Sequence, residues 1–152
     1  METRELIWFE MMKYYGLVEV PGPKHNPIIL QWFEELGYPE IKDDETAWCS
    51  LTVNIMAKRL GLEHSGKLDA RSWMKTGKSV DSTSPKIGHI VVFYRNSTAS
   101  WQGHVGLFAG WSKDKKGIWT LGGNQKNMIT ISEYPVISPM VGLLGFRELK
   151  KL

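Results

Sequence analysis

The stretch Asp43-Asp44-Glu45-Thr46-Ala47-Trp48-Cys49-Ser50 contains the only cysteine of this 152-residue chain. Short oxygen-bearing side chains such as those of Asp44 and Thr46 cap helices, because they satisfy the unpaired N–H groups of the first helical turn. The stretch therefore predicts a helix that continues to Leu60. We expect this helix to end at Gly61, since glycine adopts the positive φ of a C-terminal cap without strain.

Cys49 lies in the first turn of this predicted helix, at the edge of its apolar face. Apolar residues recur at the spacing of one helical stripe, at Cys49, Val53, Met56 and Leu60. The positive end of the helix dipole lies at the first turn, so we expect it to favour thiolate over thiol. A free cysteine is also commonly a small buried apolar residue. The partners of Cys49 must decide between these two interpretations.

Composition and charge are those of an ordinary globular protein, with 42% hydrophobic residues, 23% charged residues and a net charge of +3. This mild positive charge favours anionic polymers such as cell wall or nucleic acid only weakly. A single cysteine excludes an intramolecular disulfide framework and a cysteine-rich zinc site. The first residues lack a signal-peptide pattern, and no apolar run reaches the ~18 residues of a membrane span. We expect a protein that stays in the cytoplasm unless something else releases it.

Helix signals fill the first half of the chain and strand signals the second half. Helices are predicted at 3–15, 27–36, 46–60 and, capped by Asp69, up to residue 75. Short β-branched and aromatic runs predict strands at 87–95, 104–111, 117–121, 128–134 and 142–147. This order predicts one α+β domain over 1–152, with a helical part at about 1–78 and a β-meander at about 86–148. The helices would pack on one face of an antiparallel sheet or half-barrel of about five strands.

A thiol nucleophile needs a base, and histidine is the usual choice because it titrates near neutrality. His25 and His64 lie in predicted loops, where a solvated side chain is expected. His89 and His104 each open a predicted strand. Glycines on both sides of His104 leave room for a backbone or ligand to approach closely. A lone strand histidine is also often a satisfied core residue, so the pattern alone does not decide its role.

The segment Leu121-Gly122-Gly123-Asn124-Gln125 lies one strand beyond His104. An amide oxygen at such a strand end can orient the imidazole of a catalytic histidine. A plain turn is the alternative, because Gly and Asn are ordinary turn formers. The chain lacks histidine pairs at helical spacing, Cys-x-x-Cys, an EF-hand pattern and the lysine of a phosphate loop. We therefore expect neither a metal nor a cofactor.

Four ordered motifs together resemble the NlpC/P60 and CHAP superfamily of papain-like cell-wall cysteine hydrolases, closest to a compact single-domain branch of bacteria and phages. The motifs are Asp-Glu-Thr-Ala-Trp-Cys-Ser at 44–50, Gly-x-Ile-Val-Val-Phe at 88–93, Trp-Gln-Gly-His-Val-Gly at 101–106 and Leu-Gly-Gly-Asn-Gln at 121–125. Residues 16–23, followed by Asn26-Pro27, also resemble the start of that branch. The resemblance thus spans nearly the whole chain.

The resemblance implies a papain-like fold and assigns a role to each motif residue. Cys49 matches the nucleophile and His104 the general base. Asn124 matches the third, orienting residue, and Gln125 either takes that role instead or lines the site and binds substrate. Trp101 would form a wall of the cleft, and Trp48 would also contact substrate.

One position departs from the family pattern. The family usually has Asp after the glycine of Gly-x-Ile-Val-Val-Phe, where this chain has His89. That Asp is generally structural, so we expect activity to survive its replacement. The substitution also raises the expectation that His89 lies near the site and influences its pH dependence.

The resemblance implies a peptidoglycan hydrolase that cleaves an amide bond of the wall peptide, as an endopeptidase or an N-acetylmuramoyl-L-alanine amidase. We expect a monomer that acts on wall peptidoglycan, without nucleic-acid binding or membrane insertion. A phage endolysin, reaching the wall after release, is the expected setting, and a secreted antibacterial effector is the second. Two other readings stay open: an inactive wall-binding module, and a thiol hydrolase or acyltransferase acting on a protein or lipid.

Overall fold

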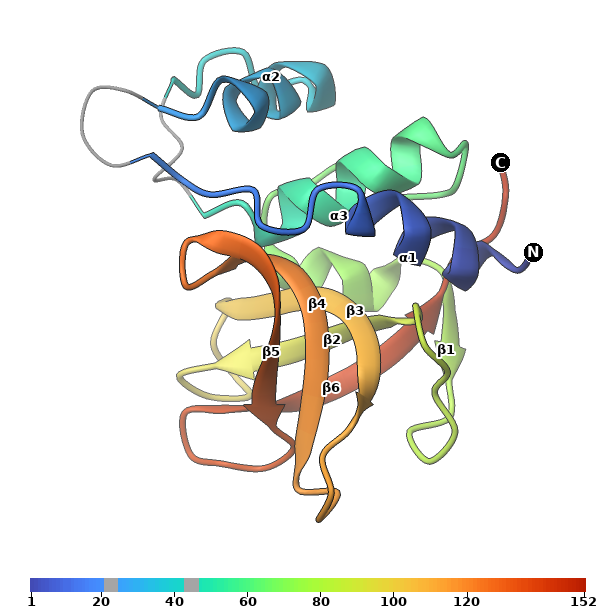
Figure 1. The fold of residues 1–152 in the computed structure, drawn as a ribbon. Helices are drawn as coiled ribbons and strands as arrows, with labels where there is room; N and C mark the ends of the chain where they lie inside the picture. Colours follow the sequence, from blue (N-terminus) through green and yellow to red (C-terminus); the bar gives the residue numbers. More distant parts are fainter. Residues whose placement is uncertain (21–24, 43–46) are drawn as a thin grey trace.

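The computed structural model describes residues 1–20, 25–42 and 47–152. Over these residues the fold is α+β, as predicted, with three α-helices, one short 3-10 helix and six strands (Figure 1). The elements are α1 (Thr3–Met12), α2 (Pro27–Leu36), α3 (Cys49–Arg59), η1 (Ala70–Lys75), β1 (Lys78–Val80), β2 (Ile90–Arg95), β3 (Gly103–Trp111), β4 (Gly117–Gln125), β5 (Met128–Pro135) and β6 (Val141–Glu148).

The six strands form one antiparallel sheet in the order β1-β6-β2-β3-β4-β5. Strands β2 to β5 make the predicted meander. β6 departs from it, because it crosses back to pair with the other edge of β2. The prediction of about five strands missed β1, whose three residues are too few to show alternation and become a strand only by pairing with β6.

The curled sheet separates two apolar cores. α1 and α3 lie on one face of the sheet, and α2 lies beyond α3 (Figure 1). The larger core fills the space between helices and sheet and includes Val92, Val105 and Leu121. The smaller core lies inside the curl and includes Phe93. Tyr134 of β5 packs against it, with its ring centroid 5.0 Å from that of Phe93 on β2. Side chains alternate between the two faces along each strand, so neighbouring residues of one strand contribute to different cores.

α3 is the most buried helix, although a single apolar stripe was predicted for it. Every residue from Cys49 to Ala57 is buried, because α2 covers one side of α3 and the sheet covers the other. Its polar side chains are satisfied by the loop that follows: Ser50 Oγ donates to the Lys67 carbonyl at 2.6 Å, and Asn54 Oδ1 accepts from the Gly66 N–H at 2.8 Å. These buried bonds fix the 61–68 loop against the helix.

The helix ends follow the predicted chemistry with two differences. Asn26 caps α2 by accepting from the Ile28 N–H at 2.9 Å, and Gly37 and Gly61 adopt φ of +104° and +70° just after their helices. The first helix ends at Met12, short of the predicted residue 15. The fourth helix, after Asp69, is a 3-10 helix.

The backbone of Gly123 in β4 lies directly against α3, which requires a residue without a side chain. A Cβ at this position would lie 2.8 Å from the Trp48 ring and would also contact Thr52 Oγ1. Real Cβ atoms do not approach other atoms this closely, so a side chain here would push β4 away from the start of α3.

We predict that Gly123→Ala lowers the free energy of unfolding by about 1–3 kcal/mol, the usual cost of overpacking a tight core. Urea unfolding of both proteins measures this. Gly145→Ala is the matched control, because its added Cβ would meet only the flexible end of Met74, at 3.0 Å. Equal losses for the two variants would contradict a specific contact between β4 and α3.

Candidate active site

The start of α3 holds Cys49 against the start of β3. The helix begins at Cys49, with Trp48 as its N-cap residue, and the Trp48 carbonyl accepts the first helical bond from the Thr52 N–H at 3.1 Å. The predicted caps, Asp44 and Thr46, lie outside the described residues. The N–H groups of Cys49 and Ser50 precede this first helical bond, so they are free to hydrogen-bond a group at the helix start.

Trp48 is a packing residue, which corrects the prediction that it binds substrate. Its side chain is completely buried, at 0% exposure. Its indole N–H donates to Glu19 Oε1 at 3.0 Å, so the one polar atom of the ring is also satisfied. No surface of Trp48 is available to a ligand in this structure. The residue fixes the helix start in place of a polar capping side chain.

Burial, more than the helix dipole, sets the pKa of the Cys49 thiol. Cys49 is only 6% exposed, and this burial raises its pKa. The nearby backbone N–H groups of Val105 on β3 and of Ser50 and Cys49 lower the pKa, as does the charge of Arg95, but by less. The prediction of a favoured thiolate was therefore wrong in direction: the resting group is a thiol.

His104 is held by Gln125, and its hydrogen bond fixes the tautomer of the ring. Its Nε2 lies 2.9 Å from Gln125 Oε1. The Gln125 amide nitrogen donates to the carbonyls of Thr120 and Thr130, at 3.0 and 2.6 Å, so only the amide oxygen is left to face the histidine. That oxygen can only accept, and His104 Nε2 must therefore carry a proton. In the neutral ring Nδ1 is then the basic nitrogen.

The partner of His104 is thus Gln125 and not Asn124, the residue that motif position favoured. Among the described residues no hydrogen bond joins Asn124 to His104. The reason is local backbone geometry: the β4–β5 register shifts between Gly122 and Gln125, and Asn124 adopts a left-handed φ of +58°. This irregularity turns the Gln125 side chain toward His104.

Tyr134 is a member of the site that sequence reasoning missed. Its ring stacks on His104 with centroids 4.7 Å apart and an interplanar angle of 26°. Burial raises the pKa of its phenol, and Cys49, once ionised at high pH, raises it further. No sequence pattern marks Tyr134, because β5 reaches β3 only through the curl of the sheet.

Cys49 and His104 share neighbours, although no hydrogen bond joins their side chains among the described residues. The N–H of Val105, the residue that follows His104, lies near the sulfur, and Cys49 lies within electrostatic range of Tyr134, which covers the His104 ring. Burial lowers the pKa of His104 to about 4, and the Gln125 hydrogen bond only partly opposes this. A neutral thiol and a neutral imidazole are therefore the resting forms near pH 7.

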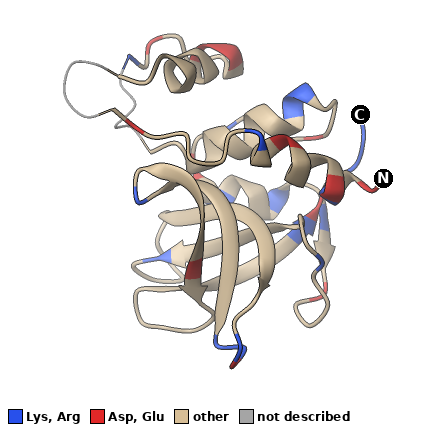
Figure 2. Cartoon of the chain, in the orientation of Figure 1, with Lys and Arg blue, Asp and Glu red and all other residues tan. Residues whose placement is uncertain are grey.

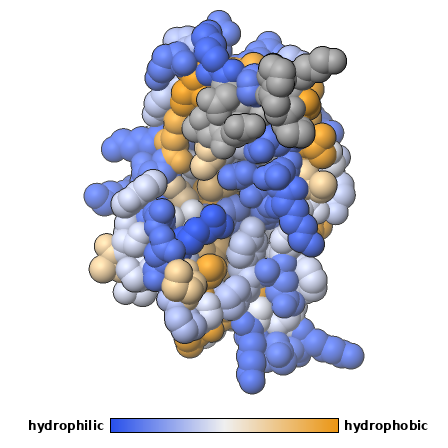
Figure 3. Space-filling view, turned by 90° about the vertical axis from the view of Figure 1, so that its left-hand side faces the viewer, coloured by the Kyte–Doolittle hydropathy of each residue, from blue (hydrophilic) through white to orange (hydrophobic). Residues whose placement is uncertain are grey.

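Trp101 lies on the β2–β3 loop, two residues before β3, and is 73% exposed. Its ring is thus available to a binding partner, and its predicted place in the wall of a cleft stays a prediction. Figure 3 looks onto the end of the molecule that carries this loop and the β4–β5 turn. This end is largely hydrophilic, with scattered apolar side chains.

His89 lies away from Cys49, which corrects the expectation that it lies near the site. It precedes β2, four residues before Phe93, the residue paired with His104, or about 13 Å along a strand. Its Nδ1 accepts from the Lys86 N–H at 2.9 Å, and burial lowers its pKa. The charges that act on it, such as that of Glu148, come from the other end of the sheet.

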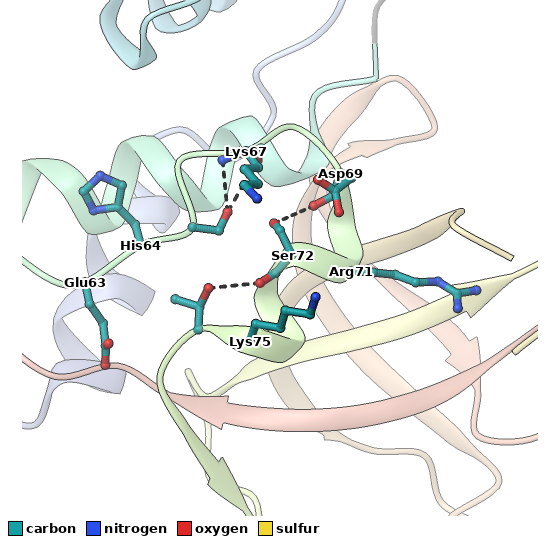
Figure 4. A pocket seen from close by; sticks show the side chains of 9 residues that line it. Glu63, His64, Lys67, Asp69, Arg71, Ser72 and Lys75 are labelled. Carbon is teal, nitrogen blue, oxygen red and sulfur yellow. Dashed lines mark hydrogen bonds between the residues drawn. The ribbon is translucent and has the colours of Figure 1, made fainter. Parts of the chain in front are cut away.

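A polar hollow of about 470 Å³ lies between the 63–69 loop and η1 (Figure 4). Its polar groups serve the fold: Ser72 Oγ donates to the Asp69 carbonyl, and Arg71 is directed away from Glu63 and His64. Arg71 instead donates to carbonyls of the loop that leads into β3, at Ser97, Thr98 and Gln102. The hollow contains neither Cys49 nor His104 and presents no convergent chemistry.

Among residues 1–20, 25–42 and 47–152, no three His, Cys, Asp or Glu side chains are grouped so that they could hold a metal ion. Within the same residues no helix is both long and apolar enough to cross a bilayer. No protein-family model matches the chain, and no curated protein matches it either.

We predict that His104 makes the protein less stable in acid. Its pKa in the folded state, about 4, is below the unfolded value near 6.5, so the unfolded chain binds more protons between these values. Stability from this group is complete above pH 6.5 and falls as the pH drops toward 4, by about 2–3 kcal/mol between pH 7 and 4.5. Urea unfolding at both pH values measures the loss, and His104→Gln should remove it. An unchanged pH dependence in the variant would show that His104 is not the group responsible.

Proposed function

We propose that the protein is a cysteine hydrolase that cleaves an amide bond through a thioester on Cys49. The observation that carries this proposal is the His104–Gln125 hydrogen bond. It leaves Nδ1 as the basic nitrogen of a neutral imidazole, and His104 shares the neighbours Val105 and Tyr134 with Cys49, the only cysteine of the chain. A histidine of the core would also be hydrogen-bonded, but within the described residues Nδ1 of His104 has no partner, which leaves it available as a general base.

In the proposed reaction the proton moves as the sulfur attacks. His104 Nδ1 accepts the Cys49 proton while Sγ bonds to the carbonyl carbon, and the carbonyl electrons move to its oxygen. The tetrahedral intermediate collapses when the imidazolium donates its proton to the leaving amine, which leaves a thioester. A water molecule, deprotonated by His104, then attacks the thioester and releases the acid and the free thiol. Because both groups rest uncharged, no ion pair is needed before substrate binds.

The start of α3 supplies groups suited to the developing oxyanion. The backbone N–H groups of Cys49 and Ser50 lie close enough to Sγ to lower its pKa, and they precede the first helical bond. A carbonyl carbon bonded to Sγ would place its oxygen in this same region. Backbone donors that are fixed before substrate arrives stabilise such a charge without reorganisation.

We further propose that the substrate is the peptide of bacterial peptidoglycan and that the fold is the papain-like fold of NlpC/P60 and CHAP hydrolases. Support comes from the four ordered motifs and from the positions of Cys49 and His104 at a helix start and a strand start. Cleavage would be that of an endopeptidase or an N-acetylmuramoyl-L-alanine amidase. Lysis of a phage host is the setting that we propose, with antibacterial delivery as the second.

We predict that the native protein clears a suspension of purified cell walls and that Cys49→Ala does not, because the variant lacks the nucleophile. Turbidity measures clearing, and mass analysis of the released fragments identifies the bond. Clearing by both proteins would exclude Cys49 as the nucleophile. If both are inert on walls from several species but hold to them, a wall-binding module replaces this proposal. If Cys49 forms a thioester with an acyl-protein or acyl-lipid substrate and not with cell wall, the protein is a thiol hydrolase or acyltransferase acting on those substrates.

We predict that Gln125→Met lowers kcat on the order of a hundredfold, because His104 loses the acceptor that orients it. Methionine preserves the length of the side chain without hydrogen bonds. Asn124→Gly is the matched control, since glycine tolerates the left-handed φ of this position and removes only the amide; it should retain nearly full activity. The reverse pattern would return the orienting role to Asn124. Unfolding in urea checks that both variants fold.

A further inference from the structure

We propose that Arg95 and Tyr134 form a subsite for a substrate carboxylate beside Cys49. The proposal rests on the proposed function and specifies its substrate: an acyl group with a free carboxylate close to the bond that is cleaved. Arg95 would bind the carboxylate through its guanidinium, and the Tyr134 hydroxyl would donate to the same group. Both residues would then determine specificity and would take no part in bond breaking.

Strand geometry places Arg95 on the same face as His104. Phe93 of β2 is directly paired with His104 of β3, and Arg95 follows Phe93 by two residues. Side chains two apart on a strand point to the same face, and diagonal neighbours of this kind lie within reach of long side chains. The Arg95 N–H also donates to the Gln102 carbonyl at 3.1 Å, so the pairing of the strands extends to this residue.

Arg95 differs from the other four arginines of the chain, which all donate to described groups. Arg4 and Arg59 bond to carboxylates, and Arg71 and Arg147 donate to backbone carbonyls. Within the described parts of the chain, the guanidinium of Arg95 has no hydrogen bond or ion pair, and its side chain is exposed. In Figure 2 the strands carry little charge, and the end of β2, which is Arg95, is coloured as basic. A guanidinium whose N–H groups are not already hydrogen-bonded can bind an anionic group of a ligand.

The charge of Arg95 reaches the reacting groups. It lowers the pKa of Cys49, of His104 and of Tyr134, which places the guanidinium within electrostatic range of all three. The Tyr134 hydroxyl also has no hydrogen-bond partner among the described residues, and its phenol stays protonated because burial raises its pKa. A neutral phenol can donate to a carboxylate, and a guanidinium can bind it through two parallel bonds. Together they match a carboxylate better than an amide.

The test compares purified wall with the same wall after its peptide carboxylates have been converted to carboxamides by carbodiimide and ammonium. For the native protein, kcat/KM should be roughly tenfold to a hundredfold higher on untreated wall, the range expected for hydrogen bonds to a charged group. Arg95→Gln should reduce this preference to nearly one, and Arg95→Lys should keep part of it. Tyr134→Phe should reduce the preference by less than Arg95→Gln, because it removes one neutral donor.

Lys113→Gln is the control for net charge, because Lys113 is an exposed cation in the β3–β4 turn. Lys113→Gln should keep the native preference for untreated wall. Walls are polyanionic, so if the preference depended only on the net charge of the protein, this variant would lose it as well. A preference that Arg95→Gln leaves intact, with Cys49-dependent clearing still present, overturns the subsite alone. An equal loss in Lys113→Gln also overturns it, in favour of general attraction. If Cys49→Ala clears walls as well as the native protein, the proposed function itself fails.

Discussion

The carboxamide of Gln125 is the constraint on which the candidate site depends. Its two N–H groups are taken by backbone carbonyls on both sides of the β4–β5 turn, so the orientation of the amide is fixed by main-chain atoms. This leaves the oxygen for His104, and the oxygen in turn determines which ring nitrogen carries the proton. The tautomer of the buried His104 ring is thus set by the irregularity of β4 just before the β4–β5 turn. A change that displaces either of these carbonyls would reorient the amide and, through it, the imidazole.

Burial gives the site a second property, which is the absence of resting charge. The dipole of α3 and three backbone N–H groups favour a thiolate, yet removal of the sulfur from water outweighs them. The same desolvation depresses the basicity of His104. Both shifts act against an ion pair, so reactivity would arise only when a carbonyl group enters and proton transfer accompanies bond formation. Such a thiol is also protected from adventitious oxidation, because the thiolate is the oxidisable form.

Local sequence signals predicted the helical and strand regions well, because caps, glycines and period-two runs are local. Asn26, Gly37 and Gly61 act as predicted, and Cys49 and His104 lie at the start of a helix and a strand. What failed depends on tertiary structure. The burial of Trp48 against β4 and the raised pKa of Cys49, which lies against β3, come from the packing of the sheet on α3. β1 exists only through its partner strand, and Tyr134 reaches His104 only because the sheet curls. The choice between Asn124 and Gln125 could not be made from sequence either, since a register shift of one residue exchanges the faces to which neighbouring side chains point.

The three backbone carbonyls that accept from Arg71 affect the free energy with which a partner would bind the β2–β3 loop. They fix the backbone of the β2–β3 loop, while Trp101, two residues before β3, stays in solvent. A partner that binds Trp101 would restrict the conformations of one side chain, which costs about 0.5–1.5 kcal/mol of conformational entropy. It would not have to order the loop backbone, which costs ~1–2 kcal/mol for each residue, because folding has already ordered it. The loop is in this sense preorganised.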